Sequence, residues 1–300
     1  MRLTFRVWIG VLSGLLPVAL MAQSDTTEID VRWARVALVS GASIGLTGGV
    51  WIGLNDVWYA DYERTVFHSF DDGPEWLGMD KAGHLWSGYN GGRWGHAMLR
   101  WAGVEQRRSA LIGGSMGLVF LTGVEVMDGH SSGWGFSWWD MAANTAGAGL
   151  FIGQQLAWKE QRLTVKLSAH HTAFASQRPD LLGTAATERL LKDYNGQTIW
   201  LSGNLHAFGV GGDRFPKWLN VALGYGAENM VSGVPGSFEA QHGNGPRFTQ
   251  VFLSVDADLT RIRSRSSVVR TLLFLANCIK IPAPALEFRE NRVLLHGFYF

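Results

Sequence analysis

Cysteine is nearly absent from this chain. Among its 300 residues the single cysteine is Cys278, so no disulfide can form within the chain, even in an oxidising compartment. A zinc site built from several cysteines is excluded for the same reason. The fold must therefore be held together by packing and hydrogen bonds.

Charge is sparse and evenly balanced. The chain has 26 Lys and Arg against 25 Asp and Glu, which gives a net charge of +1 at pH 7. No block of Lys or Arg stands out in the sequence. We therefore expect no nucleic acid or other polyanion as a partner.

Several well-known site motifs are missing as well. The sequence has no His-Glu-x-x-His zinc motif and no phosphate-binding P-loop. Gly-x-Ser-x-Gly occurs around Ser43 and Ser115, but both lie inside expected helices, whereas a nucleophile elbow needs a strand-to-helix turn. His170 and His171 are adjacent in an expected strand, so they point to opposite faces and are poor joint ligands.

The N-terminus predicts export. Arg2 and Arg6 precede an apolar run over residues 7–21, and the small residue Ala22 follows. This pattern predicts a signal peptide over residues 1–22, because an uncleaved anchor helix would need a longer apolar run. No cysteine stands at the cleavage point, so we expect no lipid attachment there.

The first half of the mature chain reads as helical. Long apolar segments without period-two alternation are separated by short polar breaks, which predicts helices over residues 31–59, 80–101, 106–127 and 138–158. Their length and apolar character suit either a membrane span or a bundle beside a membrane, and we favour the second slightly. Glycines recur at helical spacing, which predicts close helix–helix contacts at Gly41, Gly45, Gly49 and Gly53, at Gly113 and Gly117, and at Gly149 and Gly153.

The second half reads as antiparallel strands. Alternating segments separated by Gly, Pro and Asn clusters predict strands in residues 162–172, 197–208, 218–228 and 250–259. A short helix over residues 267–278 and a final hairpin around Glu290 and Asn291 follow. The last residue, Phe300, is typical of the final strand of outer-membrane barrels, but about six strands are fewer than a small barrel needs.

We therefore predict an α+β protein with two domains. A Gly-rich four-helix bundle, able to associate with a membrane, occupies residues 30–160. An antiparallel β-rich domain with one short helix occupies residues 161–300.

Polar residues inside the apolar helices mark a candidate site. In an up-and-down bundle with short loops, the second segment starts, the third ends and the fourth starts at one end. This arrangement would bring together Asp80, Lys81 and His84 with Glu125 and Asp128 and with Ser137, Asp140 and Asn144.

Each polar residue also has a structural explanation. Asp80 is a suitable N-cap, and Ser137 with Asp140 resembles a capping box. A buried carboxylate at Glu125 needs a partner, for which His84 is the candidate. Three purposes stay open for the cluster: a structural network, an acid/base site with His84 as the proton carrier, or a site for a divalent cation.

These stretches resemble a known family. "DKAGH", "RRSALIGGSMGLVFLTGVEVMD" and "GWGFSWWDMAANTAGAGLF" are similar to the YfiM-like family of predicted periplasmic lipoproteins, a domain of unknown function. A looser similarity links them to VanZ-like membrane proteins. The resemblance covers roughly residues 75–158 and lacks the lipoprotein cysteine. It implies a location in a Gram-negative envelope and brings no established reaction. The matching residues are Asp80, Lys81, His84, Glu125, Asp128, Gly135, Ser137, Asp140, Asn144 and Gly147.

We therefore expect an exported envelope protein of the periplasm or outer membrane, with a structural or binding role and a membrane or lipid as partner. No cofactor is predicted, although a divalent cation fits the polar cluster. The alternative is an envelope hydrolase or transferase acting on a lipid or cell-wall component, with His84 as acid/base and Glu125 and Asp140 orienting it or holding metal.

Overall fold

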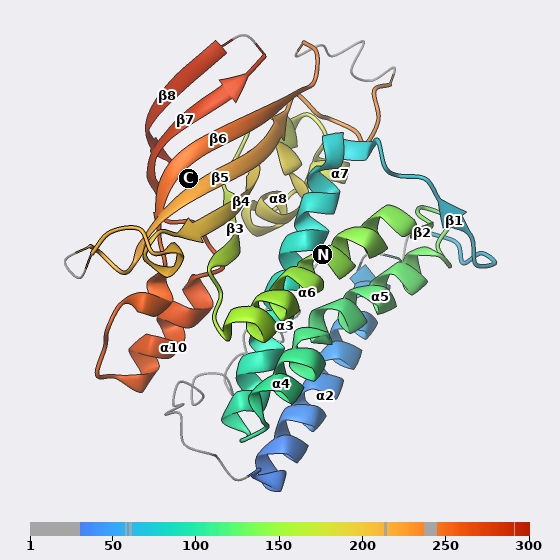
Figure 1. The fold of residues 1–300 in the computed structure, drawn as a ribbon. Coiled ribbons are helices and arrows are strands. Elements are labelled where there is room, and N and C mark those ends of the chain that lie inside the picture. Colours follow the sequence, from blue (N-terminus) through green and yellow to red (C-terminus); the bar gives the residue numbers. More distant parts are fainter. Residues whose placement is uncertain (1–30, 58, 60–61, 213–214, 237–244, 291) are drawn as a thin grey trace. The chain divides into compact units, whose positions relative to one another are not determined.

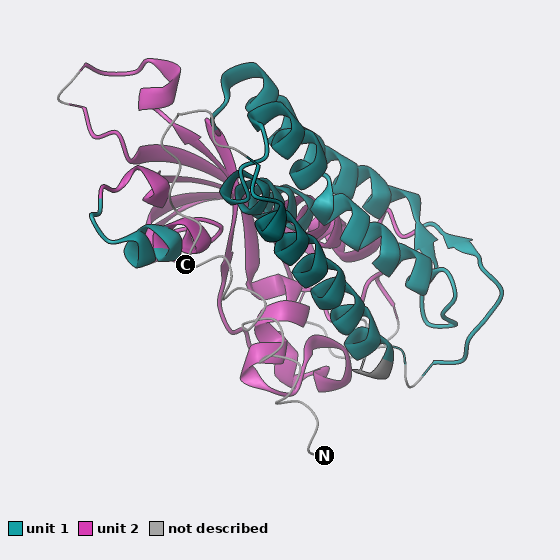
Figure 2. Ribbon diagram, turned by 90° about the horizontal axis from the view of Figure 1, so that it is seen from below, with its two compact units in different colours: residues 1–71, 87–160, 264–272 teal, residues 72–86, 161–263, 273–300 magenta. Residues whose placement is uncertain are grey.

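The computed structural model describes residues 31–57, 59, 62–212, 215–236, 245–290 and 292–300. The predicted signal peptide lies outside them. The chain forms two compact units, each discontinuous in sequence (Figure 2). Unit 1 comprises residues 1–71, 87–160 and 264–272, and unit 2 comprises residues 72–86, 161–263 and 273–300. The expected division into domains at residue 160 stays a prediction.

The predicted helices are present. The first segment is α2 (Trp33–Val57), the second is α3 (Met79–Trp101) and the fourth is α6 (Trp138–Trp158). The third is interrupted, because a π-helical turn (Ser109–Gly113) separates α4 (Gln106–Arg108) from α5 (Met116–Asp128). Helix α3 belongs to both units, since the division between them falls within it, after Trp86.

Glycines bring α3 and α5 into backbone contact within unit 1. A Cβ built on Gly91 would lie 2.6 Å from the Cα of Gly117, and one on Gly95 would lie 2.3 Å from the carbonyl oxygen of Gly113. Gly91 meets Gly117 of α5, and the later Gly95 meets the earlier Gly113 in the π-helical turn before α5, so the two segments run antiparallel. This is the direction on which the predicted gathering of polar residues depends.

Two of the three predicted glycine rows were wrong. Nothing lies within 4 Å of a Cβ built on Gly41, Gly45 or Gly49 of α2, nor on Gly149 or Gly153 of α6. Only the row at Gly113 and Gly117 packs closely, and its partners are glycines of α3. Spacing places residues on one face of a helix but does not show which face meets a neighbour.

Unit 2 is built on a six-stranded antiparallel sheet of consecutive strands (Figure 1). Its strands are β3 (Leu163–Ala169), β4 (Gln197–Asn204), β5 (Leu219–Glu228), β6 (Phe248–Ala257), β7 (Ala283–Arg289) and β8 (Arg292–Tyr299). The short helix α10 (Ser267–Ala276) precedes β7, and the last two strands form the predicted hairpin. The predicted α+β class is confirmed.

Smaller elements complete the described chain. Parallel strands β1 (Ser69–Phe70) and β2 (Phe136–Ser137) pair in unit 1. Unit 2 also holds the short helices α7 (Pro179–Leu182) and α8 (Ala186–Lys192). The remaining elements are single 3₁₀ turns: η2 (Glu75–Gly78), η4 (Phe174–Ser176), η5 (Tyr194–Gly196), η6 (His206–Phe208) and η7 (Leu259–Arg261).

The sheet of unit 2 curls until its last strand approaches the first strands. The Tyr299 ring of β8 lies 5.9 Å from that of Trp200 on β4, and its hydroxyl lies 2.9 Å from that of Thr198. Beyond the end of β3, His170 contacts the carbonyl oxygen of Phe300. The concave face is therefore closed largely by the sheet itself, around a core that includes Phe252.

Candidate polar site at the start of α3

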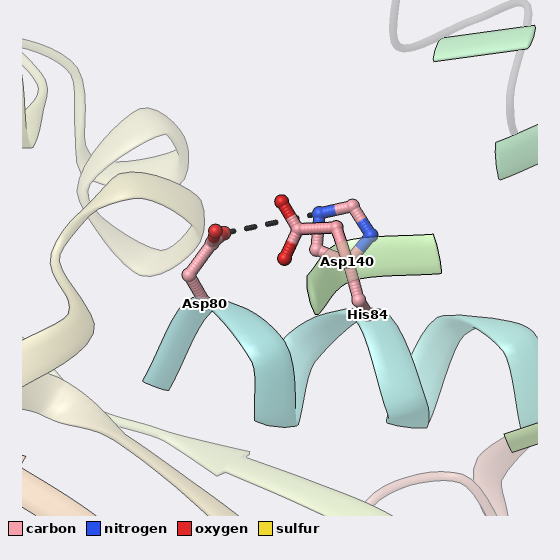
Figure 3. Close-up of side chains that lie close together, drawn as sticks. All are labelled: Asp80, His84 and Asp140. Carbon is pink, nitrogen blue, oxygen red and sulfur yellow. Dashed lines mark ion pairs between the residues drawn. The ribbon is translucent and has the colours of Figure 1, made fainter. Parts of the chain in front are cut away.

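Asp80 and His84 lie one turn apart on α3, as the spacing predicts. The Nε2 of His84 is 3.9 Å from Oδ1 of Asp80, and both side chains are partly exposed (Figure 3). The same Asp80 oxygen accepts a 2.7 Å hydrogen bond from the hydroxyl of Tyr194. Lys81 donates to the other Asp80 oxygen at 3.0 Å and also pairs with Asp72. Asp80 is thus held on both oxygens.

The turn before α3 sets the position of these residues. Trp76 and Leu77 both have φ near 50°, a left-handed conformation that is uncommon for large side chains. Contacts within unit 2 hold it: the Trp76 amide donates to the carbonyl of Gly233, and the Tyr225 hydroxyl donates to that of Leu77. The sheet and its loops therefore determine where α3 begins.

Asp80 is not the predicted N-cap. Helix α3 begins at Met79, so Asp80 is already in its first turn, where the helix dipole still favours an anion. Its carboxylate binds Tyr194 and Lys81. Asp80 therefore joins α3 to a residue distant in the sequence and does not only stabilise its own helix end.

The predicted residues of α5 and α6 meet within unit 1. Glu125 is 1% exposed, and its Oε2 accepts the backbone N–H of Ser137 at 3.2 Å. The Ser137 hydroxyl accepts the N–H of Asp140 at 3.0 Å, which confirms Ser137 as the N-cap of α6. Asn144, one turn further on, is fully buried. The anion at the end of α5 therefore stabilises the start of α6.

Asp128 has a separate partner. Its Oδ1 accepts a 2.6 Å hydrogen bond from the hydroxyl of Tyr59, just beyond α2. Burial is the largest cause that raises the pKa of Tyr59, and the neighbouring Asp128 adds to it. This contact joins the polypeptide after α2 to the end of α5.

Glu125, Ser137 and Asp128 therefore each take part in a hydrogen bond within unit 1. Among the described residues, the group of side chains that could hold a metal ion is Asp80, His84 and Asp140 (Figure 3). Asp140 is buried, whereas Asp80 and His84 are partly exposed. Carboxylate oxygens with one imidazole nitrogen form a donor set for a divalent cation.

Sequence reasoning missed several residues around this site. Tyr194 and Asp72 both support the start of α3, and Tyr59 holds Asp128. Burial raises the pKa of Glu75, against the effect of Lys81. None of these residues belongs to a periodic pattern, because each lies in a turn or loop that only the tertiary structure places.

The comparisons with known proteins identify one related family. The model of a family described as a predicted periplasmic lipoprotein (DUF2279) matches residues 69–153. This span includes every candidate site residue and less than half of the chain. It supports an exported envelope protein that contains a domain of unknown function. Neither the curated proteins nor the solved structures gave a match.

Two helical stretches are long and apolar enough to cross a membrane. They are Trp33–Asn55, with a mean hydropathy of 1.5, and Gln106–Asp128, with 1.7. Within an 18-residue window of each stretch, 6% of the residues are buried in the first and 33% in the second. Length and composition alone mark them, and core helices of soluble proteins meet the same criterion.

Proposed function

We propose that this chain is a cell-envelope protein with a binding role, and that Asp80, His84 and Asp140 together bind a divalent cation. The observation that carries the proposal is the grouping of these three ligand-bearing side chains (Figure 3). Two carboxylates offset the charge of such an ion and suit manganese, while the imidazole suits zinc.

The packing of α3 against α6 supports this grouping. A Cβ on Gly88 of α3 would lie 2.6 Å from the carbonyl oxygen of Asn144 on α6, and further along both helices the His96 ring lies 5.5 Å from that of Phe151. The two helices therefore run parallel. One turn before Gly88 is His84, and one turn before Asn144 is Asp140.

Hydrogen bonds behind the ligands also suit a metal site. The Tyr194 hydroxyl and Lys81 both donate to Asp80, which orients its carboxylate. Ser137 fixes the first turn of α6, on which Asp140 stands. Partners of this kind orient metal ligands and contribute strongly to affinity.

The proposal is tested by calorimetric titration of the purified protein with Zn²⁺ and Mn²⁺. We expect one bound ion per chain, and at a free ion concentration of 100 times Kd a rise in the free energy of unfolding of about 2.7 kcal/mol. His84→Ala and Asp140→Asn each weaken binding at least tenfold, because the first removes a ligand and the second removes the negative charge of one. His171→Ala is the matched control, since that histidine is exposed and outside the group.

A protein that binds neither ion, or one whose affinity is unchanged in both ligand variants, contradicts the proposal. The variants must keep the thermal midpoint of the metal-free wild type for the comparison to hold. Asp140→Asn preserves the shape of the side chain and guards against a folding artefact.

The alternative is an envelope enzyme with His84 as acid/base. Partial exposure of His84 favours it, since 19% of the side chain can reach solvent. Glu125 is buried and accepts a hydrogen bond from the Ser137 amide, so Asp140 is the better carboxylate to orient the His84 ring. Loss of an envelope phenotype in His84→Ala, in a protein that binds no ion and keeps its stability, would support this alternative.

A further inference from the structure

The sheet of unit 2 carries an apolar row across its convex face. Leu201, Leu223, Leu253, Leu286 and Leu295 are paired in register from β4 to β8. Their side chains are 36–75% exposed. Two flanking rows on the same face, also exposed, pair Val221 with Val255 and Val251 with Phe288 and Val293. The face is thus apolar over five adjacent strands.

The opposite, concave face combines the aromatic core around Trp200 and Phe252 with buried polar and charged residues. Lys166 and Asp256 are both buried and form a 2.7 Å ion pair. Asp256 also accepts from the hydroxyl of Ser202 at 2.6 Å. Glu287 is buried beside Gln250, which donates to it at 2.8 Å. Charged residues therefore point inward while leucine and valine point outward.

The exposed leucine and valine rows are the reverse of what a water-soluble sheet shows on its outer face. A half-buried antiparallel sheet in water places apolar residues inside and polar residues outside. Sheets that face lipid show apolar residues outside and polar residues inside, with aromatic residues at the boundaries. The apolar rows extend over an area too large to be scattered surface residues.

One end of the sheet has the composition of a membrane boundary. The pairing register places the start of β5 and the ends of β4, β6 and β8 at this end. Just beyond these strand ends, or in the last residues of β8, Phe208, Trp218 and Phe298 are exposed. Lys217 and Arg263 are exposed at the same end and line, with Arg261 and Trp218, a hollow of about 580 Å³.

We propose that the convex face of this sheet lies in the acyl region of an anionic lipid membrane, with its basic end among the phosphate headgroups. Trp218, whose ring carries an N–H, suits the boundary between acyl chains and water. Lys and Arg near the surface are attracted to anionic lipids by about 1 kcal/mol each, which corresponds to about fivefold in affinity.

The shape of the face favours lipid over a second copy of the chain. The sheet curls around its concave side, so the leucine row lies on a convex surface. Two convex surfaces touch over a small area, whereas fluid acyl chains follow the curvature.

Vesicle flotation tests the proposal. The full mature protein is mixed with vesicles of phosphatidylcholine, with or without 30% phosphatidylglycerol at about 0.1 M salt, and we expect flotation with the anionic vesicles. Leu223→Asp with Leu253→Asp reduces partitioning at least tenfold, because charges on a lipid-facing surface are strongly disfavoured. Leu191→Asp, at an exposed leucine on α8 that is outside the leucine and valine rows, leaves it unchanged.

The basic end has its own variants. Lys217→Glu with Arg263→Glu removes binding to anionic vesicles at low salt, whereas Arg292→Glu, exposed at the other end of the sheet, changes it less than twofold. A polarity-sensitive fluorophore is attached to the cysteine of Leu253→Cys in a Cys278→Ser background. Its fluorescence intensity rises when vesicles are added, whereas the same fluorophore at Leu191→Cys shows no rise. These measurements do not involve a metal ion, so a negative result would contradict the membrane proposal without affecting the proposed cation site.

Three results overturn the proposal. One is equal flotation of the wild type and the leucine variant. Another is a fluorophore at Leu253→Cys that stays in water when vesicles are bound. The third is a wild-type dimer in light scattering that becomes a monomer in Leu223→Asp, while neither protein binds vesicles. That result would assign the face to contact with a second copy of the chain.

Discussion

Lys280 shows how a single side chain depends on its burial. It is 1% exposed, its Nζ lies 4.6 Å from the centre of the Trp200 ring, and it donates to the carbonyl of Ile281 at 3.0 Å. Burial lowers its pKa to about 8, Asp256 opposes this and Lys166 adds to it. The folded state therefore disfavours the charged form of this lysine.

Stability should respond to pH through Lys280. Between pH 8 and 10.5 the lysine is protonated in the unfolded chain and neutral in the folded one, so the free energy of unfolding rises with pH. Relative to Lys280→Met, the wild type gains on the order of 1 kcal/mol per pH unit in this window. Urea unfolding at pH 7.5, 8.5 and 9.5 measures it.

The exposed lysine Lys217 supplies the control. Lys217→Met should keep a constant difference from the wild type over the same pH range, because that side chain is in water in both states. A difference for Lys280→Met that does not change with pH would show that the lysine is solvated in the folded protein.

At the scale of elements, the contact between α3 and α5 depends on backbone approach. Gly91 and Gly117 face each other so closely that no Cβ fits between them. Glycine destabilises a helix interior by about 1 kcal/mol relative to alanine, so the packing energy of this contact must exceed that amount. Among the described residues, no atom lies within 4 Å of a Cβ built on Gly41, Gly45, Gly48 or Gly49 of α2, so no contact offsets the cost of these glycines.

Alanine substitutions should therefore have opposite signs in the two helices. Gly91→Ala lowers the free energy of unfolding by about 1–3 kcal/mol, because the methyl group overlaps Gly117. Gly45→Ala raises it by about 0.5–1 kcal/mol, since nothing lies within 4 Å and helix propensity improves. Chemical denaturation of both variants measures the changes, and stabilisation by Gly91→Ala would contradict this packing.

At the scale of the whole molecule, both compact units expose apolar surface. In unit 1 the exposed large side chains include Ile44, Ile52 and Val119 on helices. In unit 2 they form the leucine row of the sheet. Together with the match to a periplasmic family, this surface is consistent with an envelope protein at a lipid phase.

Cell fractionation tests the location. We expect the mature protein in the envelope fraction, and mass spectrometry of its N-terminus should start at Gln23 if the signal peptide is cleaved after Ala22. Ala22→Leu, which removes the small residue at the cut site, should leave the longer precursor. Recovery of the wild type in the cytoplasmic fraction, with Met1 retained, would refute export.

Residue patterns alone predicted most of the elements. Apolar length marked the helices and alternation marked the strands, because both reflect local geometry of the backbone. Within the candidate site, spacing placed Asp80 and His84 on one face of a helix, and the Ser137 cap followed from its position before an apolar run. These are short-range relations that the order of residues contains.

Tertiary structure alone decided the rest. It placed the Asp80 carboxylate against the Tyr194 hydroxyl, the Glu125 carboxylate against the Ser137 amide, and the close glycine contact between α3 and the segment Gly113–Gly117. It also showed which face of each alternating strand is outside. Alternation states that two faces differ, but only the curl of the sheet decides that the charged face is enclosed and the leucine face is not.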